Sequence, residues 1–295
     1  MNEDKLKNNS SIQKDTLSIF QIAVMTTICV ASLRTLPPMA EEGRASILMY
    51  IIPAILFLIP TSLVSAEFAT TYKGGIYVWI REAFGNRMGF VAIWLQWIQN
   101  VVWYPVQLAF VAAALAFTIN RGDLSNSGLF TAVVIIVVYW LSTFLAFKGG
   151  NLFAKVSSIG GMIGVLIPGA ILIVLGILWM AQGQPISESY LQSSYIPKIT
   201  GISSLVLIVS NVLSYAGMEM NAVHAGQMEN PKKDFTKAIA LAFILILCVF
   251  IFPTLAIAIA IPADKLGMAN GIMVAFQEFF EKLNISWMSN VISGA

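Results

Sequence analysis

Charged side chains are scarce in this sequence of 295 residues. Asp, Glu, Lys and Arg together make up 11% of it, whereas an average soluble domain has about 25%. Cysteine is nearly absent as well: Cys29 and Cys248 are the only two, and both lie in apolar segments. Such cysteines indicate small buried side chains and not a disulfide-stabilised secreted domain. No basic tract or alternation of basic and aromatic residues occurs, so we expect no nucleic-acid partner.

The sequence has a single histidine, His224. A histidine-based metal site needs at least a second one, so we predict no metal site. The patterns Gly-x-Gly-Asp, His-Glu-x-x-His and Gly-x-x-x-x-Gly-Lys-Ser/Thr, which would indicate intramembrane or nucleotide-dependent enzymes, do not occur. We therefore expect a protein that is not an enzyme and needs no cofactor.

Hydrophobic residues, in contrast, are abundant: they make up 58% of the chain, and the mean hydropathy is +0.80. A transmembrane helix needs about 20 consecutive apolar residues. Seven segments are long enough, and an eighth begins near residue 285, where the chain stops after about ten residues. The composition therefore predicts an all-α integral membrane protein with seven full spans, at 17–39, 46–70, 88–119, 128–147, 154–181, 201–228 and 236–261.

These segments suggest an organisation along the chain. A polar tail, 1–16, precedes a group of five spans over 17–181, a loop over 182–200, and a second group over 201–295. The first span is too long for a signal-peptide core, so we expect it to be retained. Residues 266–283 have apolar positions at helical spacing, which predicts an interfacial helix on the outer surface. We expect either a chain that ends within its eighth span or a fragment of a longer protein.

Lysine and arginine predict the orientation in the membrane. If the N-terminus is cytoplasmic and the spans alternate, eleven of the seventeen basic residues face the cytoplasm and five face outward, while Arg34 lies inside a span. Cytoplasmic loops of membrane proteins carry such an excess of positive charge. We therefore predict a multi-pass protein with a cytoplasmic N-terminus.

Two spans contain interruptions. The first reads "VASLRTLPPMAEEG", in which Pro37 and Pro38 follow Arg34, and the sixth reads "SYAGMEMNAVHAG", in which Gly217 is the weakest helix position. Irregular backbone inside lipid is tolerated where it lines a cavity or is buried in protein. Unwound helix ends present partial charges of both signs, which suit a zwitterion. Interruptions five spans apart are also what an inverted five-helix repeat would produce. The alternative is that each is only a kink or a close packing contact, and the pattern alone leaves both open.

Four motifs resemble a known family. "AEFATTYKGGIYVWI" (66–80) is similar to the Ala-Glu and Gly-Gly-x-Tyr-x-Trp signature of the amino acid–polyamine–organocation superfamily, and "ENPKKDFTKAI" (229–239) is similar to its loop after the sixth span. "VASLRTLPPMAEEG" (30–43) and "LSYAGMEMNAVHAGQMENP" (213–231) resemble the bacterial glutamate/γ-aminobutyrate antiporter branch. The resemblance extends from about residue 19 to the last residue.

The resemblance implies two inverted five-helix repeats plus two further helices, located in the bacterial inner membrane, with helices nine to twelve and most of the eighth missing. In this fold helices one, two, six and seven form a moving bundle, and a substrate is held at the breaks of helices one and six. Carried over to this sequence, the substrate-binding positions are Ala31, Ser32, Leu33, Tyr215, Ala216 and Gly217. Glu219 matches a glutamate of helix six that the resemblance connects with gating or proton sensing.

Other residues leave alternatives open. Arg34 could bind the side-chain carboxylate of a substrate, but we favour an ion pair with Glu219, Glu41 or Glu42. Glu219 could act as a proton-responsive gate or as a protonated structural residue.

His224 could respond to pH, although packing within the protein is the preferred interpretation. For Glu67 we favour capping or an ion pair over substrate contact, with gating as the functional alternative.

The leading hypothesis is a secondary transporter that exchanges an acidic amino acid, such as glutamate, for its decarboxylated amine, such as γ-aminobutyrate. The competing hypothesis is a truncated, non-transporting membrane protein or assembly partner derived from such a transporter. The expected partners are a small amino acid and the lipid bilayer, and a homo-oligomer is an open alternative.

Overall fold

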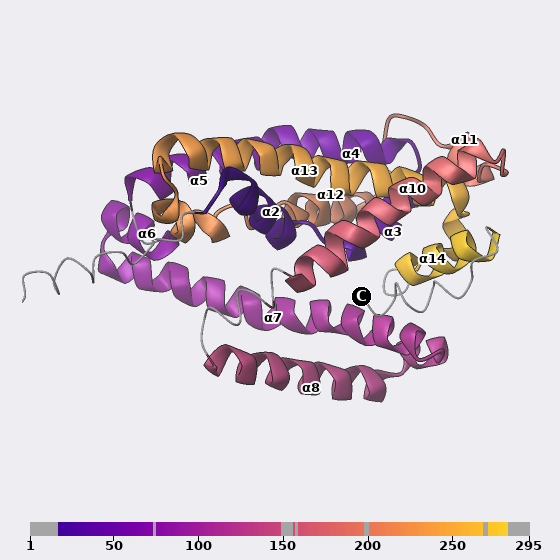
Figure 1. Cartoon of the computed structure of the whole chain (residues 1–295), viewed down its shortest axis with the longest axis horizontal. Helices are drawn as coiled ribbons and strands as arrows, with labels where there is room; N and C mark the ends of the chain where they lie inside the picture. The colour runs from indigo at the N-terminus through magenta and orange to yellow at the C-terminus, as the bar shows by residue number, and fades with distance from the viewer. Residues whose placement is uncertain are drawn as a thin grey trace, which may run out of the picture.

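The computed structural model describes residues 17–72, 75–148, 156, 159–197, 201–267 and 271–282, and over these residues it is helical and contains no strand (Figure 1). Within these described residues, five helices are long and apolar enough to cross a membrane, and a bent pair of shorter helices makes a sixth candidate. The chain is therefore an all-α, multi-pass membrane protein, as its composition predicts. The predicted tail 1–16 and the beginning of an eighth span lie outside the described residues.

The candidate spans match the hydropathy segments within a few residues. The first is the pair α2 (Ile19–Val30) and Leu33–Ala40, which meet at 46°. The sixth segment that we predicted, 201–228, is not a continuous helix: α12 (Ile202–Ser214) ends early, and the chain continues as a turn and a short 3₁₀ helix, η5 (Met220–Gln227). The five uninterrupted spans are Ala45–Thr71, Asn86–Thr118, Gly128–Phe147, Ile159–Ala181 and Pro231–Ala260.

Two of the uninterrupted spans contain a π-helical turn beside prolines. The second span consists of α4 (Ala45–Pro53), the π turn η2 (Ala54–Leu58) and α5 (Ile59–Thr71). The fifth ends as the π turn η4 (Met162–Leu166) and α10 (Ile167–Ala181). In each, a proline is the second residue after the π turn, and a proline cannot donate to the helical ladder. The wider turn keeps the helix continuous across the missing hydrogen bond.

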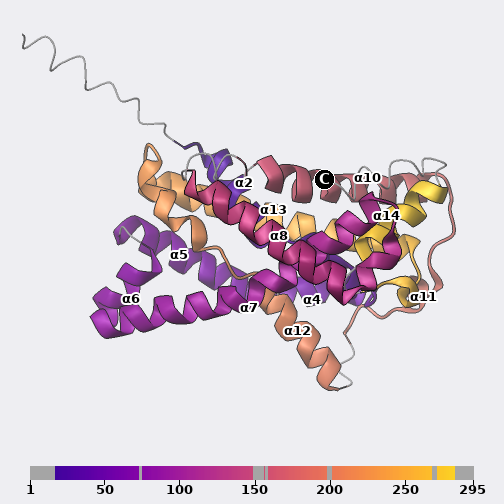
Figure 2. The same cartoon turned by 90° about the horizontal axis from the view of Figure 1, so that it is seen from below.

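A central bundle surrounds the longest buried helix, α13 (Pro231–Ala260). This helix packs against α2, α4, α5 and α10, and α12 packs against α4 (Figure 1). Ile22, Tyr50 and Phe250 lie fully buried between these helices. The first, second, sixth and seventh segments thus form one packed unit, from which α12 projects at an angle (Figure 2).

The span α13 begins earlier than predicted. We expected "ENPKKD" to be a loop, but Pro231 already begins the helix. Proline is well suited to the first helical turn, because the N–H it lacks would have no intrahelical acceptor there. Asp234 supports this start, since its carboxylate accepts a hydrogen bond from the backbone N–H of Asn230 at 3.2 Å and adds negative charge to the first turn.

A second unit is the antiparallel pair α7 (Asn86–Thr118) and α8 (Gly128–Phe147), which runs beside the bundle (Figure 1). A short amphipathic helix, α6 (Ile76–Phe84), packs against the start of α7. Large apolar side chains of α8, such as Trp140 and Phe144, are exposed. In a membrane protein such faces are compatible with lipid contact, because lipid tails are as apolar as the side chains.

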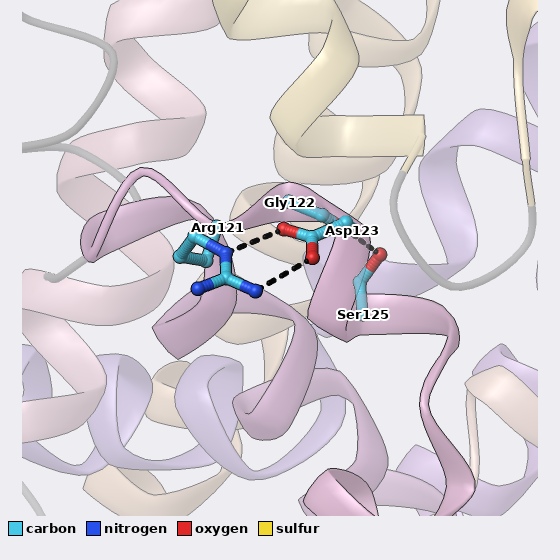
Figure 3. A network of polar contacts seen from close by, with 4 residues as sticks. All are labelled: Arg121, Gly122, Asp123 and Ser125. Atoms are coloured by element: carbon cyan, nitrogen blue, oxygen red, sulfur yellow. Dashed lines mark hydrogen bonds and ion pairs between the residues drawn. The ribbon is translucent and has the colours of Figure 1, made fainter.

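The connection between α7 and α8 contains the short helix η3 (Gly122–Asn126) and a bidentate ion pair (Figure 3). The Nε and Nη2 atoms of Arg121 donate to the two carboxylate oxygens of Asp123, each at 3.0 Å. The Ser125 hydroxyl donates to the carbonyl oxygen of Gly122 at 2.6 Å. The hydrogen bonds from Arg121 lower the pKa of the exposed Asp123 carboxyl.

Short helices cover one end of the bundle, namely α11 (Glu188–Gln192), η6 (Ala263–Lys265) and α14 (Gly271–Lys282) (Figure 1). For α14 we predicted an interfacial helix, and an amphipathic helix is present. Its apolar face, however, contacts the protein: Phe276 and Phe279 are buried, and α14 packs on α10 and on the second half of the first span. Gly271 allows this close approach, because a Cβ atom there would lie 2.7 Å from Cβ of Pro37.

Candidate functional site

The first span is unwound between its two helical parts. The last helical hydrogen bond runs from the N–H of Ala31 to the carbonyl of Thr27, at 2.7 Å. Ala31 and Ser32 then have extended conformations, with ψ of 129° and 121°. The chain resumes as the 3₁₀ turn η1 (Leu33–Thr35) and the short helix α3 (Leu36–Ala40).

Prolines explain why a new helix begins there. Pro37 and Pro38 are the second and third residues of α3. Neither has an N–H to donate to the carbonyl four residues earlier. The Thr35 hydroxyl donates to the carbonyl of Ser32 at 2.9 Å. The break that the sequence predicts at residues 31–34 is present.

The sixth segment is interrupted at the predicted position as well. The helix α12 ends at Ser214, residues 215–219 form turns, and η5 follows. Gly217 has a φ of +117°, a backbone conformation that residues other than glycine rarely adopt. Glycine is therefore the residue that lets the helix part at this point.

The two breaks lie against each other. A Cβ atom built on Gly217 would lie 3.5 Å from Cγ2 of Val30 and 3.7 Å from the carbonyl oxygen of Cys29. Asn221, just beyond the second break, donates through Nδ2 to the Thr26 hydroxyl at 3.1 Å. Segments almost 200 residues apart in sequence, α2 and the chain from Gly217 into η5, are thus held together.

Backbone donors at both breaks have no acceptor within the described part of the chain. The N–H groups of Ser32 and Gly217 form no hydrogen bond to any described residue. The carbonyl oxygen of Cys29, in the last turn of α2, lies 3.7 Å from the Cβ position of Gly217, and the C-terminus of a helix carries a partial negative charge. The junction therefore offers both donors and acceptors from the backbone.

The candidate residues divide into those at the junction and those turned away from it. Ser32, Ala216 and Gly217 are partly accessible, whereas Ala31 is 4% exposed. Leu33 is buried, and its Cδ2 lies 3.6 Å from the Cβ position of Gly169 in α10. Gly217 is thus placed at the junction by its distances to Cys29 and Val30, whereas the side chain of Leu33 packs toward α10.

The contacts of Tyr215 indicate a structural role for its side chain. It is fully buried, and its hydroxyl donates to the carbonyl of Tyr50 at 3.0 Å. The hydroxyl of Tyr50 is in turn 3.1 Å from the hydroxyl of Thr254. These contacts connect the sixth, second and seventh segments.

Arg34 does not form the ion pair that we favoured. Its Nε donates to Oε1 of Gln107 in α7 at 3.1 Å, and in the described residues no carboxylate oxygen, including those of Glu219, Glu41 and Glu42, lies within 4 Å of its guanidinium. The prediction was wrong because the bend after Ser32 turns the 3₁₀ segment toward α7. Partial burial raises the pKa of Glu41 and of Glu42 at the turn beyond α3, and the charge of Glu42 raises that of Glu41 further.

Among the described residues, no ion pair joins the predicted gating residues to one another. Glu219 is partly exposed and directly precedes η5. His224 lies within η5, where its Nδ1 is 3.1 Å from Oε1 of Gln227. Glu67 is exposed on α5, a helix that packs against η5.

Two polar residues at the site were not predicted as functional. Gln107 reaches Arg34, and Asn221 connects the two broken segments. Both are amides in apolar segments, and a buried amide normally has a hydrogen-bond partner. Their polarity in an apolar segment was the available signal, but it does not identify the partner.

Comparison with known proteins adds independent findings. The family described as "Amino acid permease" matches residues 16–295. An uncharacterized transporter of Legionella pneumophila is 42% identical over 282 residues, which cover 95% of this chain and 60% of that protein.

Two named antiporters of Lactococcus lactis are more distant. A glutamate/gamma-aminobutyrate antiporter is 29% identical over 94% of this chain and 56% of its own length. A probable agmatine/putrescine antiporter is 29% identical over 90% of this chain and 56% of its own length. The chain thus spans between half and two thirds of the length of these relatives.

Proposed function

Because the chain belongs to the amino acid permease family, we propose that it is a secondary transporter that binds an amino acid between its two broken segments. We further propose exchange of an acidic amino acid, such as glutamate, for its decarboxylated amine, such as γ-aminobutyrate, by alternating access. A relative named as such an antiporter, similar over nearly the whole chain, supports this substrate pair.

The observation that carries the proposal is the contact between Gly217 and residues 29–30, with backbone N–H groups at both breaks that have no acceptor among the described residues. In the proposed complex the substrate carboxylate binds the N–H groups of Ser32 and Gly217. Its ammonium binds carbonyl groups at the ends of α2 and α12. Backbone recognition of this kind suits any α-amino acid, so the side chain must be selected elsewhere.

Alternating access would use the packed unit of the first, second, sixth and seventh segments as the moving part. The hydroxyl contacts from Tyr215 through Tyr50 to Thr254 support this assignment, because they connect three of its segments. We propose the bacterial inner membrane as the location and a cytoplasmic N-terminus.

Counterflow in proteoliposomes tests this function. Vesicles containing the purified chain and loaded with unlabelled glutamate or γ-aminobutyrate should accumulate labelled glutamate from outside. Unloaded vesicles and vesicles without protein should not. Binding of glutamate without accumulation would favour the second candidate, a membrane protein of this family that does not transport.

Glu219 has the proposed role of a proton-responsive gate beside the second break, with His224 and Glu67 as further candidates on or beside η5. A glutamate in a membrane-spanning segment is costly when charged and can change its protonation state with its surroundings. Glu219→Gln should therefore remove most of the pH dependence of exchange. An unchanged rate and pH profile in this variant would exclude the gating role but not the binding site.

A further inference from the structure

Arg34 is a basic residue within the first membrane-spanning segment, and its hydrogen-bond partner is a neutral side chain. Its Nε atom donates to Oε1 of Gln107 at 3.1 Å, across 73 residues of sequence. The guanidinium is only partly buried, and it lies two residues after Ser32, where the first helix is unwound. Its position is therefore adjacent to the proposed binding site of the amino acid.

The charge of Arg34 is not neutralised by the described part of the protein. No carboxylate oxygen of a described residue lies within 4 Å of the guanidinium. Ionisable groups within membrane segments are costly and usually pair with an opposite charge or bind a ligand. The arrangement thus leaves the positive charge for an anion that the described chain does not provide.

Gln107 determines how the guanidinium is presented. Because it accepts a hydrogen bond from Nε, the plane of the guanidinium is oriented while its charge is kept. The two terminal nitrogens, Nη1 and Nη2, donate to no described residue. An edge of two parallel N–H donors matches a carboxylate, which can bind it bidentately.

We propose that Gln107 is a positioning residue that orients Arg34 to select an amino acid with an anionic side chain over its neutral isostere. This inference rests on the proposed function, because it places the side-chain carboxylate of the bound amino acid on Arg34. The proposal attributes the preference for an acidic side chain over its amide to the hydrogen bond between Arg34 in the first span and Gln107 in the third. The backbone at the two breaks recognises the α-amino and α-carboxyl groups independently of this contact.

The test compares glutamate with glutamine, which differ in charge but hardly in shape. Equilibrium binding of each labelled amino acid to the purified chain in detergent gives a ratio of affinities. We expect the unsubstituted chain to bind glutamate more tightly. Gln107→Glu places a carboxylate beside Arg34 that competes with the substrate, so it should reduce the ratio by roughly tenfold or more. Affinity for glutamine should change by less than about threefold.

Two further variants separate positioning from general disruption. Gln107→Leu removes the acceptor and should also reduce the ratio, whereas Gln107→Asn retains an acceptor and should restore part of it. Gln99→Glu is the matched control, because Gln99 is an exposed glutamine of the same helix. It should leave the ratio unchanged, which would exclude a general effect of an added charge on α7.

A measurement on the unsubstituted chain keeps the proposal testable if the variants fail to fold. Phenylglyoxal modifies accessible arginines, and peptide mass spectrometry can quantify its reaction at Arg34. Glutamate should protect Arg34 and glutamine should not. Equal protection by both, or by neither while glutamate binds, would overturn the role of Arg34 and Gln107.

The outcomes distinguish this inference from the function on which it rests. If the chain binds glutamate and glutamine equally, or if Gln107→Glu weakens both equally, the inference is wrong and the proposed binding site stands. If the chain binds neither amino acid nor γ-aminobutyrate, the proposed function fails, and the inference fails with it.

Discussion

Gly217 shows how much of the candidate site depends on one residue. Its φ of +117° lets the sixth segment leave the helical path, and its Cβ position lies 3.7 Å from the carbonyl oxygen of Cys29. The space around it is ordinary, because a Cβ atom would meet its nearest neighbour at 3.5 Å. Its conformation, and not its size, is therefore what a substitution would disturb.

Gly217→Ala should destabilise the fold and weaken substrate binding. An alanine at this φ is strained by about 1–2 kcal/mol, and relief of the strain would alter the break. The free energy of unfolding in mixed micelles and the affinity for glutamate should both fall. Gly226→Ala is the control, since no strained φ or close neighbour is present there. Equal effects of the two substitutions would contradict a specific role for the backbone of Gly217.

Glu41 and Glu42 make stability depend on pH. Partial burial raises the pKa of both carboxyl groups above the ordinary value of 4.5. The folded state therefore binds their protons more tightly than the unfolded state does, and stability falls as the pH rises from 4.5 through the raised pKa values. Glu41→Gln should reduce this decline and stabilise the protein at neutral pH. Thermal unfolding between pH 4 and pH 8 measures it, with the exposed Glu229→Gln as a control that should not alter the profile.

At the scale of elements, one loop connects three parts of the bundle end. We call residues 187–195 the strap. The N–H of Ser187 donates to the carbonyl of Ile259 at 2.8 Å, and the Ser189 hydroxyl accepts from the N–H of Ala263 at 3.2 Å. The Ser193 hydroxyl accepts from the N–H of Arg44 at 3.0 Å. The strap thereby joins the end of α13 to the turn between α3 and α4.

Arg44 should contribute most of the side-chain attachment of the strap. Its Cζ atom lies 5.2 Å from the ring centre of Tyr190 and 5.4 Å from that of Tyr195. Two such cation–π contacts are worth about 1–2 kcal/mol together. Arg44→Ala should therefore accelerate hydrogen exchange at the amides of residues 187–193. The matched control, Arg121→Ala, removes an exposed ion pair of another loop and should leave strap exchange unchanged; acceleration by both variants would exclude a specific attachment.

At the scale of the whole molecule, the helices place loops at two opposite ends. Figure 1 shows the connection between α7 and α8 at the same end as α11 and α14, while α6 and the start of α13 lie at the other end. This arrangement agrees with the alternation assumed from lysine and arginine in the sequence. Which end faces the cytoplasm depends on the charge asymmetry across a membrane.

Cysteine labelling should identify which end of the protein lies on each side of the membrane. In a chain with Cys29 and Cys248 replaced by alanine, Arg121→Cys should react with a membrane-impermeant maleimide in intact cells. Lys233→Cys should react only after the membrane is permeabilised, because the basic start of α13 is predicted to be cytoplasmic. The reverse pattern would invert the proposed topology, and labelling of both positions from outside would contradict the span count.

The sequence by itself determined the class of protein, the approximate bounds of its helices and the positions of the two breaks. Hydropathy reports the solvent around each segment, and Pro37, Pro38 and Gly217 limit the backbone through their own covalent structure. These are local properties, so they can be inferred without knowing any neighbour. The early start of α13 was missed because Pro231 and Asp234 are as typical of a first helical turn as of a loop.

Only the tertiary structure decided which residues meet. That Gly217 lies against residues 29–30, that Arg34 binds Gln107 and not a glutamate, and that α14 packs on the protein through Phe276 and Phe279 could not be inferred from the pattern. Lipid tails are as apolar as leucine, so hydropathy does not distinguish a helix face that contacts lipid from one that contacts another helix. Contacts between segments far apart in sequence depend on how the helices pack, and that packing was decided by shape and by the few polar side chains able to reach one another.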